Sequence, residues 1–199
     1  MDFTAPESIM RAAVPDTTPA AQLVVRWRDE PVLECCYGWL DEARAEPTRP
    51  DTLFDLASVT KLFVVTTFMA LVEAGRAGLD QPVSEVISAF SGQRPVAPYE
   101  DPLTPGAFVS VAETTEPVDF SKITFRHLLT HSSGLPAWRP LFRQPSREAA
   151  RRMALETAAA YPTGTNTIYS DIGLIVLGVA VEQLTGMSLD QAVAARVTD

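Results

Sequence analysis

Ser58 and Lys61 are the first residues in this sequence whose types and spacing could do chemistry. They form a Ser-x-x-Lys pattern at the start of a predicted buried helix, where residues i and i+3 are neighbours, so the lysine amine can reach the serine hydroxyl. An ordinary lysine pKa near ~10.4 must fall by ~2–3 units for the amine to act as a base at neutral pH. We expect burial and the positive end of the helix to lower the pKa of Lys61 in this way.

The rarity of lysine in this chain supports a chemical role for Lys61. Of the 16 basic residues, only Lys61 and Lys122 are lysines, and the rest are arginines. A guanidinium stays protonated in proteins, whereas a lysine amine can lose its proton. Because arginine supplies positive charge elsewhere in the chain, the lysine at this position indicates more than a need for charge.

The tripeptide Tyr169-Ser170-Asp171 is a second candidate, since it follows a Pro-Thr-Gly turn and begins an apolar helix. A phenol with a pKa near ~10 beside a lysine can relay a proton to a leaving group. The structural alternative is a serine that caps the helix after a packed tyrosine.

His127 and His131 are the only histidines and lie four residues apart in a predicted helix. That spacing could place both on one helix face as metal ligands, but the sequence offers no third ligand. We therefore expect no metal site and a structural role, in which a histidine ties the helix end to a neighbouring loop. The sequence also contains no Gly-x-Ser-x-Gly elbow, P-loop or Gly-x-Gly-x-x-Gly pattern.

The elements that must position these residues follow from the apolar pattern. Two segments, 58–74 and 171–184, are apolar on nearly all sides, so both are expected to be buried helices. Two strands, 21–28 and 32–40, are expected to form a hairpin with its turn at 29–31. Two strands followed mainly by helices favour an α+β fold over alternating βαβ units. Further helices are expected over 124–131, over 147–160 and from 188 onward.

Composition and charge exclude several classes of function. The chain has 199 residues, 46% hydrophobic and 21% charged, which is typical of a globular protein. A net charge of −9 and an isoelectric point near 4.7 argue against nucleic acids and anionic membranes as partners. The apolar runs 62–72 and 172–181 are shorter than the ~20 residues that span a bilayer. The first residues lack the pattern of a secretory signal, so we expect a cytoplasmic location.

The two cysteines and the prolines near the start predict the remaining organisation. Cys35 and Cys36 are adjacent, so we expect free thiols on opposite faces of a strand. Residues 1–19 contain three prolines and are expected to form a loose N-terminal arm. Residues 20–199 are expected to form one domain, in which 91–120 is the least regular stretch.

Three segments in order along the chain resemble the serine β-lactamase and penicillin-binding-protein superfamily. The likeness is greatest to the class C branch, which includes esterases, D-aminopeptidases and acyltransferases. The hairpin ending in Tyr37-Gly38 also fits this branch. The segments are 52–61, which reads TLFDLASVTK, 123–136, which reads ITFRHLLTHSSGLP, and 169–186, which begins YSDIG.

The resemblance implies a β-lactamase/transpeptidase-like α+β fold, with an antiparallel sheet and a helical domain. It also implies that Ser58 is the acylated nucleophile, Lys61 the base that activates it and Tyr169 the proton shuttle. The backbone N–H of Ser58 would form half of an oxyanion hole. This chemistry would use no cofactor and no metal.

Two features depart from the pattern of this branch. Asp171 stands where the branch often has asparagine, so we expect it to contact substrate and to raise the pKa of the neighbouring Lys61. The third motif, Lys-Thr-Gly or His-x-Gly on a sheet strand, is absent from the sequence. Residues 20–199 are therefore expected to form an incomplete serine hydrolase domain that lacks the C-terminal strands and corresponds to the N-terminal half.

The expected function is that of a serine hydrolase or acyltransferase that forms an acyl-enzyme on Ser58 with small ester or amide substrates. An esterase-like activity fits best. A β-lactamase or D,D-peptidase is one alternative, and a truncated, non-catalytic binding or scaffold module is another. A two-stranded hairpin is marginal on its own and has open edges, so we expect a partner chain or self-association to complete the sheet.

Overall fold

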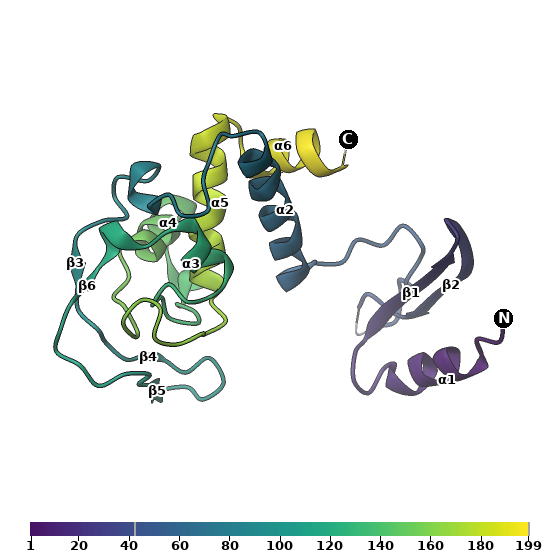
Figure 1. Cartoon of the computed structure of the whole chain (residues 1–199). Helices are drawn as coiled ribbons and strands as arrows, with labels where there is room; N and C mark the ends of the chain where they lie inside the picture. The colour runs from purple at the N-terminus through teal and green to yellow at the C-terminus, as the bar shows by residue number, and fades with distance from the viewer. Residues whose placement is uncertain (42, 199) are drawn as a thin grey trace. The chain divides into compact units, whose positions relative to one another are not determined.

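The computed structural model describes residues 1–41 and 43–198. The chain forms two compact units, Met1–Leu56 and Ala57–Asp199. The first contains a helix and a β-hairpin, and the second contains the remaining helices (Figure 1). The division lies just before Ser58, within the range 20–199 for which the sequence predicts a single domain.

The first unit begins with a helix rather than the loose arm that the sequence predicts. Helix α1 spans Thr4–Ala13, with Glu7 in its first turn and Arg11 in its last turn. Acidic and basic side chains in these places complement the helix dipole. The sequence prediction gave too much weight to proline, because Pro6 falls in the first turn, where a missing N–H costs nothing.

The predicted hairpin is present, with a turn of two residues, 28–29, in place of the expected 29–31. Strand β1 (Ala20–Trp27) pairs antiparallel with β2 (Glu30–Gly38), in the register Leu23 opposite Cys35. Arg28 and Asp29 form the turn with φ angles of 51° and 65°, the left-handed geometry that matches the twist of a hairpin.

The cysteine prediction is confirmed. Cys35 and Cys36 are both free thiols, half-buried, and successive residues of β2 point to opposite faces.

The second unit is built around the two helices that the sequence predicts as buried. Helix α2 spans Thr60–Glu73 and helix α5 spans Asp171–Thr185, and the two lie side by side (Figure 1). Only α5 is buried around most of its circumference, since α2 leaves Leu62 and Met69 66% and 40% exposed. Gly186, with a φ of 70°, ends α5 as predicted. The other helices are α3 (Phe125–Leu129), α4 (Arg147–Leu155) and α6 (Leu189–Val193), with short helical turns η1 (Ala57–Val59), η2 (Val83–Glu85), η3 (Phe120–Lys122), η4 (Leu141–Arg143) and η5 (Ala194–Thr198).

The core of the second unit lies where α2, α3 and α5 meet. Phe68 of α2 and Phe125 of α3 are fully buried and their ring centroids are 4.7 Å apart. Helix α5 contributes buried residues around most of its circumference, which explains why its sequence shows no polar stripe. This packing holds the first residues of α2 and α5, which carry the candidate site residues, close together.

The predicted irregular stretch 91–120 contains two short strand pairs. Strand β3 (Gln93–Arg94) pairs with β6 (Val118–Asp119), and β4 (Tyr99–Glu100) pairs with β5 (Phe108–Val109). Arg94 is buried, with its guanidinium 5.3 Å from the centroid of the Phe90 ring and 4.0 Å from that of Phe120. It donates hydrogen bonds to the carbonyls of residues 89, 155 and 157, which ties this stretch to the end of α4.

Within the described residues, no single helix is both long enough and apolar enough to cross a membrane. Helix α5 and the helical segment 189–198, bent by 76° at their junction, pass that length and composition test only as a pair.

Candidate active site

Ser58 and Lys61 are neighbours, as their spacing predicts. Ser58 lies in η1, the single turn that leads into α2, and the Lys61 Nζ donates a hydrogen bond to the Ser58 Oγ over 2.9 Å. Ala57, directly before Ser58, has a φ of 44°, a left-handed conformation that is uncommon for a residue with a Cβ atom. Such backbone strain is typical of functional sites.

Asp171 lies on the other side of Lys61 and forms an ion pair with it. The Asp171 Oδ1 is 2.7 Å from the Lys61 Nζ, and the two side chains are 51% and 18% exposed, respectively. Asp171 is the first residue of α5, and Ser170 caps this helix by accepting a hydrogen bond from the Gly173 N–H over 3.1 Å. The cap that the structural alternative predicts is therefore present and places Asp171 beside Lys61, but Tyr169 before it is 54% exposed rather than packed.

Tyr169 completes a cluster of four polar side chains. Its hydroxyl lies close enough to the side chains of Ser58 and Lys61 for both to influence its pKa. The Lys61 Nζ also lies 4.9 Å from the centroid of the Tyr169 ring. The structure thus brings together all four residues, Ser58, Lys61, Tyr169 and Asp171, that the sequence analysis singled out.

The pKa of Lys61 is raised, which corrects the expectation that it falls. Burial is the largest single influence and lowers this pKa, but the hydrogen bonds and charges of Asp171 and Tyr169 together outweigh it. The expected effect of Asp171 is confirmed in direction. The expected fall fails because the Asp171 carboxylate, 2.7 Å away, and Tyr169 together favour the ammonium more than partial burial disfavours it.

The pKa of Tyr169 is lowered. The largest cause is its hydrogen bond with Ser58, followed by its hydrogen bond with Lys61 and the positive charge of that residue. Neutral pH therefore leaves Lys61 charged, and the Tyr169 phenol gives up its proton more readily than an ordinary tyrosine does.

The two histidines do not share a helix face, which corrects the geometry assumed for a metal pair. Helix α3 ends at Leu129, and His131 lies beyond it with a φ of 57°. His127 stays within α3, where its Nδ1 accepts a hydrogen bond from the Thr124 N–H over 3.1 Å. Throughout the described residues, no group of three or more His, Cys, Asp or Glu side chains could hold a metal ion.

The predicted structural role of a histidine is confirmed at His131. Its Nδ1 accepts a hydrogen bond from the Ser170 N–H over 3.1 Å, which ties the end of α3 to the start of α5. The sequence analysis placed His131 outside the site, yet its ring centroid is 4.8 Å from that of Tyr169. The sequence feature that could have shown that His131 lies beside Tyr169 is the His-Ser-Ser-Gly turn of residues 131–134, which groups polar and turn-forming residues soon after α3.

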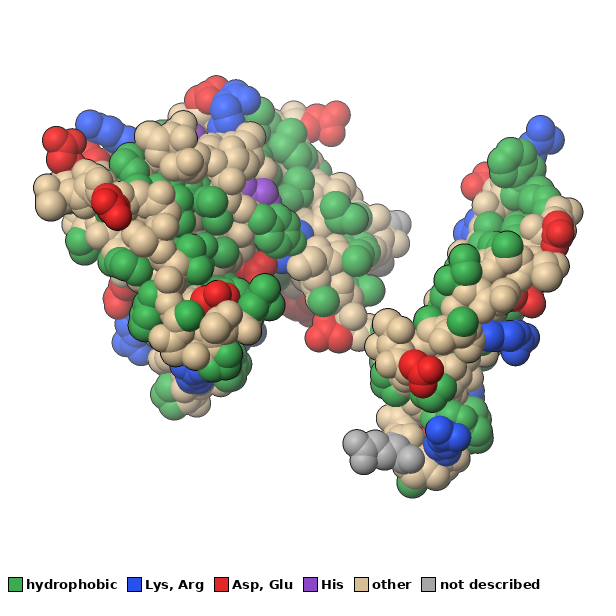
Figure 2. All heavy atoms as spheres, turned by 90° about the horizontal axis from the view of Figure 1, so that it is seen from below, with side chains coloured by type: hydrophobic (Ala, Val, Ile, Leu, Met, Phe, Trp, Pro, Cys, Tyr) green, Lys and Arg blue, Asp and Glu red, His purple; other side chains and the backbone are tan. Residues whose placement is uncertain are grey.

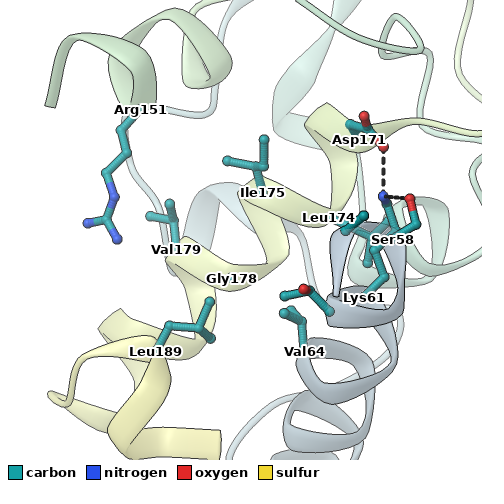
Figure 3. Close-up of a pocket in the computed structure, with 12 residues that line it drawn as sticks. Ser58, Lys61, Val64, Arg151, Asp171, Leu174, Ile175, Gly178, Val179 and Leu189 are labelled. Carbon is teal, nitrogen blue, oxygen red and sulfur yellow. Dashed lines mark hydrogen bonds and ion pairs between the residues drawn. The ribbon is translucent and has the colours of Figure 1, made fainter. Parts of the chain in front are cut away.

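Two hollows flank the pair of Ser58 and Lys61. The large hollow, of about 460 Å³, runs between α2, α5 and α6. In Figure 3, Ser58, Lys61 and Asp171 gather at one end of it and Arg151 lies at the other. Its apolar walls are formed by Val64, Leu174, Ile175, Val179 and Leu189.

The small hollow lies on the Tyr169 side of Ser58 and has a volume of about 230 Å³. Besides Ser58, Lys61 and Tyr169, it is lined by Leu62, Val65, Leu129, His131 and Leu174. The hollows therefore share the Ser58 hydroxyl and the Lys61 amine but differ in size and in the polar group beside that pair, which is Asp171 in one and Tyr169 in the other.

The chain has an α+β fold. Its serine and lysine lie at the start of a helix, with a tyrosine beside them, and these features together define a class of protein. A family model described as Beta-lactamase matches residues 10–199, so the chain belongs to the beta-lactamase family. This agrees with the resemblance and the fold that the sequence predicts.

Three relatives illustrate the range of this family. Esterase EstB of Burkholderia gladioli is 33% identical over 177 residues, covering 80% of this chain and 39% of EstB. The structure of EstCE1, described as a hydrolase with promiscuous acyltransferase activity, has 25% identity and a TM-score of 0.64, covering 90% of this chain and 45% of EstCE1. Simvastatin synthase (LovD) from Aspergillus terreus has 27% identity and a TM-score of 0.65, covering 98% and 50% of the two chains.

The chain spans about two fifths of the length of the curated relatives it matches. Its similarity to esterases and acyltransferases supports membership of a family of serine hydrolases.

Proposed function

We propose that Ser58 is the nucleophile of an esterase-like serine hydrolase or acyltransferase that acts on small ester or amide substrates. The observation that carries the proposal is the hydrogen bond from the Lys61 Nζ to the Ser58 Oγ over 2.9 Å, with the Tyr169 hydroxyl beside both side chains. A nucleophile within hydrogen-bond reach of its activating groups is the arrangement that covalent catalysis requires.

In the proposed first step, Tyr169 starts as the phenolate, and the Ser58 Oγ attacks the substrate carbonyl carbon while its proton passes to the Tyr169 oxygen. A raised Lys61 pKa and a lowered Tyr169 pKa favour this division of roles, with Lys61 as an ammonium that stabilises the phenolate. The tetrahedral intermediate then collapses as the bond to the leaving group breaks. Tyr169 returns the proton to the leaving oxygen or nitrogen, and an acyl-enzyme remains on Ser58.

The acyl group then leaves Ser58 by the reverse sequence. Water, or the hydroxyl of an acceptor, attacks the ester carbon and gives its proton to Tyr169, and Ser58 recovers a proton as its bond to carbon breaks. The Ser58 N–H, at the start of a helix, supplies one hydrogen bond to the developing oxyanion. Asp171 is half exposed beside Lys61 and is proposed to accept a hydrogen bond from the substrate.

The unequal hollows support a division between the two parts of the substrate. Tyr169, the proposed proton donor to the leaving group, lines the small hollow, so the leaving alcohol is assigned there. The large hollow is left for the acyl group, and its volume of about 460 Å³ lies in the usual range of small-molecule sites, ~300–1,000 Å³.

A matched pair of variants tests this division. Ile175→Ala, in the large hollow alone, should increase the preference for longer acyl chains in a series of p-nitrophenyl esters. Leu129→Ala, in the small hollow alone, should instead increase the preference for bulkier alcohols at a fixed acyl group. The division is wrong if the two variants change the same preference.

The nucleophile itself is tested by mass. Incubation with p-nitrophenyl butyrate should add one butyryl group to the chain, and Ser58→Ala should abolish the addition. Peptide mapping that places the acyl group on Ser132, Ser133 or Ser170 would overturn the assignment. Labelling by a β-lactam would favour the lactamase or peptidase alternative. Failure of both the ester and a fluorophosphonate to label the chain would favour the non-catalytic module.

An exposed apolar stripe along η1 and α2 supports a polypeptide partner. Val59, Leu62 and Met69 are 49%, 66% and 40% exposed, and their spacing places them on one side of the helix that Ser58 precedes. Figure 2 shows hydrophobic side chains exposed among charged ones on both units. Contiguous exposed apolar surface is typical of interaction sites.

We propose that the occupant of this stripe is a polypeptide equivalent to the part of its relatives that this chain does not match. Mixing the chain with that part of EstB should give a one-to-one complex and raise the rate of ester turnover. A chain that dimerises alone and gains nothing from the added polypeptide would assign the stripe to a second copy.

A further inference from the structure

His131 contacts three consecutive residues, which end at the first residue before α5. Its carbonyl accepts a hydrogen bond from the Ile168 N–H over 2.9 Å, and its Nδ1 accepts one from the Ser170 N–H over 3.1 Å. Between these two anchors, its ring lies against that of Tyr169, with 4.8 Å between centroids. One residue therefore holds the backbone on both sides of Tyr169 and one face of its ring.

His131 is itself held by buried structure. Its carbonyl accepts a second hydrogen bond, from the hydroxyl of the fully buried Tyr161, over 2.9 Å. Gly134, just beyond, has a φ of 92°, and a Cβ atom there would lie 2.5 Å from the Tyr161 carbonyl oxygen. The loop that carries His131 is thus packed too closely to move freely, and this rigidity passes to Tyr169.

The hydrogen bond from Ser170 fixes the protonation state of the imidazole. A backbone N–H can only donate, so the Nδ1 of His131 must accept, and the ring proton of the neutral form then lies on Nε2. A protonated imidazole would carry a proton on both nitrogens and would lose this bond. Ser170, 1% exposed, would be left with an unsatisfied backbone N–H.

Several titratable groups face this imidazole. Lys61 approaches from α2, Asp171 from α5, and Tyr169 and Tyr161 from the segment between α4 and α5. Burial is the main cause that lowers the pKa of His131, and the charge of Lys61 lowers it further against the opposing effect of Asp171. The neutral imidazole is therefore the state present at neutral pH.

We propose that His131 is a positioning residue, whose neutral imidazole sets the Tyr169 hydroxyl against Ser58 and Lys61 and whose protonation releases it. Only the catalytic meaning of this placement rests on the proposed function; the placement itself is a property of the folded chain. Acid should thus displace Tyr169 before it unfolds the protein.

The experiment follows the Tyr169 ring by NMR of chain labelled with ¹³C at tyrosine Cζ, assigned with Tyr169→Phe. In the unaltered chain, the Tyr169 signal should shift in acid with the same midpoint as the His131 imidazole. At high pH, the phenol should titrate below the ordinary value near ~10. A Tyr169 signal that does not respond while His131 titrates would overturn the proposal without any variant of His131.

Two variants separate the hydrogen bond from the imidazole. His131→Asn keeps an acceptor near the place of Nδ1 and tolerates a positive φ, so Tyr169 should keep its low pKa and lose its response to acid. His131→Ala loses the acceptor, so the Tyr169 pKa should return toward ~10 and acylation of Ser58 should slow by about tenfold or more. His127→Asn is the matched control and should change neither property.

The outcomes for positioning and for function are distinct. If Tyr169 moves as described but no ester acylates Ser58, positioning is supported and the proposed function fails. If Ser58 is acylated and folded His131→Ala reacts as fast as the unaltered chain with an unchanged Tyr169 pKa, the positioning role is wrong and the function stands.

Discussion

The surroundings of His127 and His131 form a natural comparison within one short segment. Both side chains are half-buried, and both use Nδ1 to accept a backbone N–H over 3.1 Å. The N–H on His127 belongs to Thr124, three residues away, and the one on His131 belongs to Ser170, 39 residues away. The same chemical contact completes a helix cap in the first case and brings a distant tripeptide beside Ser58 in the second.

The two hydrogen bonds are of the same type and differ in the number of residues that separate donor from acceptor. The bond between neighbouring residues supports local structure, and the bond between distant residues helps to build the candidate active site. The α3 cap is closed within one turn of chain, so changes there should alter stability and little else. The start of α5 is held by residues from α2, the loop after α3 and its own cap, so changes there should alter chemistry as well. The two lysines provide a test, because Lys122 lies in the region just before α3 and Lys61 lies in the candidate active site.

Among the variants of the two regions, Lys61→Met should cause the largest change in the rate of Ser58 acylation. Loss of the ammonium removes the charge that stabilises the Tyr169 phenolate, so the rate of Ser58 acylation should fall by ~10²–10⁴. Lys122→Met is the matched control, because Lys122 is 82% exposed and should leave the rate unchanged. Rates are measured by release of p-nitrophenol. If Lys61→Met and Lys122→Met lowered the acylation rate equally, the proposed difference between the candidate active site and the α3 region would be wrong.

Ser170→Ala should change both stability and rate. The buried Ser170 Oγ donates to the Pro136 carbonyl over 2.6 Å and accepts from the Gly173 N–H over 3.1 Å, so truncation leaves both backbone groups without this partner. We expect a loss of ~1–3 kcal/mol in the free energy of unfolding, measured in urea. Acylation should slow as Tyr169 shifts.

Ser146→Ala provides the matched control for that cap. Ser146 caps α4 in the same way, through a 3.2 Å hydrogen bond from the Ala149 N–H at an exposed position. The Ser146→Ala variant should lose ~1 kcal/mol in the free energy of unfolding and should acylate Ser58 at an unchanged rate.

Asp171→Asn should produce a smaller change, seen as a shift with pH. Without the carboxylate, the pKa of Lys61 should fall, and NMR of the lysine ε-carbons can follow this, because the chain gives only two such signals. Because the pKa of Lys61 is raised by folding, its contribution to stability is present below the unfolded value near ~10.4 and is lost as pH rises through the folded value. The variant should weaken this dependence, and an unchanged Lys61 titration would show that the ion pair contributes little.

The same variant distinguishes two roles for Lys61. If the ammonium supports Tyr169, the fall in activity at high pH should move to lower pH in Asp171→Asn. If the neutral amine of Lys61 is the base, as the sequence analysis expects, the rise in activity with pH should move to lower pH instead.

Thr124→Ala should have the smallest effect on the site. The Thr124 hydroxyl accepts a hydrogen bond from the His127 N–H over 3.4 Å as part of the α3 cap. Its loss should cost ~1 kcal/mol in unfolding by urea, with no change in the pKa of Tyr169. A change in that pKa would show that the α3 cap and the site are coupled through the short helix.

The features that could be predicted from the sequence are those that a few neighbouring residues determine. The contact between Ser58 and Lys61 follows from helix geometry, and the helix expected from residue 188 onward is α6, which begins at Leu189. The hairpin, the two long helices and the burial of α5 follow from the apolar pattern, whereas the exposed side of α2 does not. The family resemblance then added an expected role for Tyr169, which local pattern alone left open.

The features that escaped prediction depend on contacts between distant segments. The net direction of the Lys61 pKa escaped prediction, because Asp171, 2.7 Å away, and Tyr169 together outweigh burial, and this balance depends on the packing of α5 against α2. The role of Arg94 was missed because a buried guanidinium held by carbonyls leaves no charge pattern in the sequence. Helix α1 was missed for a local reason, since a proline in the first turn looks the same as one in a loop.

The strand pairing that joins the two ends of the stretch 91–120 determines where the chain can accept inserted residues. Pairing of Gln93 with Asp119 and of Arg94 with Val118 joins the two ends of this stretch, and the 101–107 turn is closed by a hydrogen bond from the Asp101 N–H to the Ala107 carbonyl over 2.9 Å. Once a base is closed, doubling the length of the loop above it costs only ~0.6 kcal/mol of chain entropy. The 101–107 turn is therefore a place where residues can be inserted, or a short peptide displayed, while α2 and α5 keep their packing.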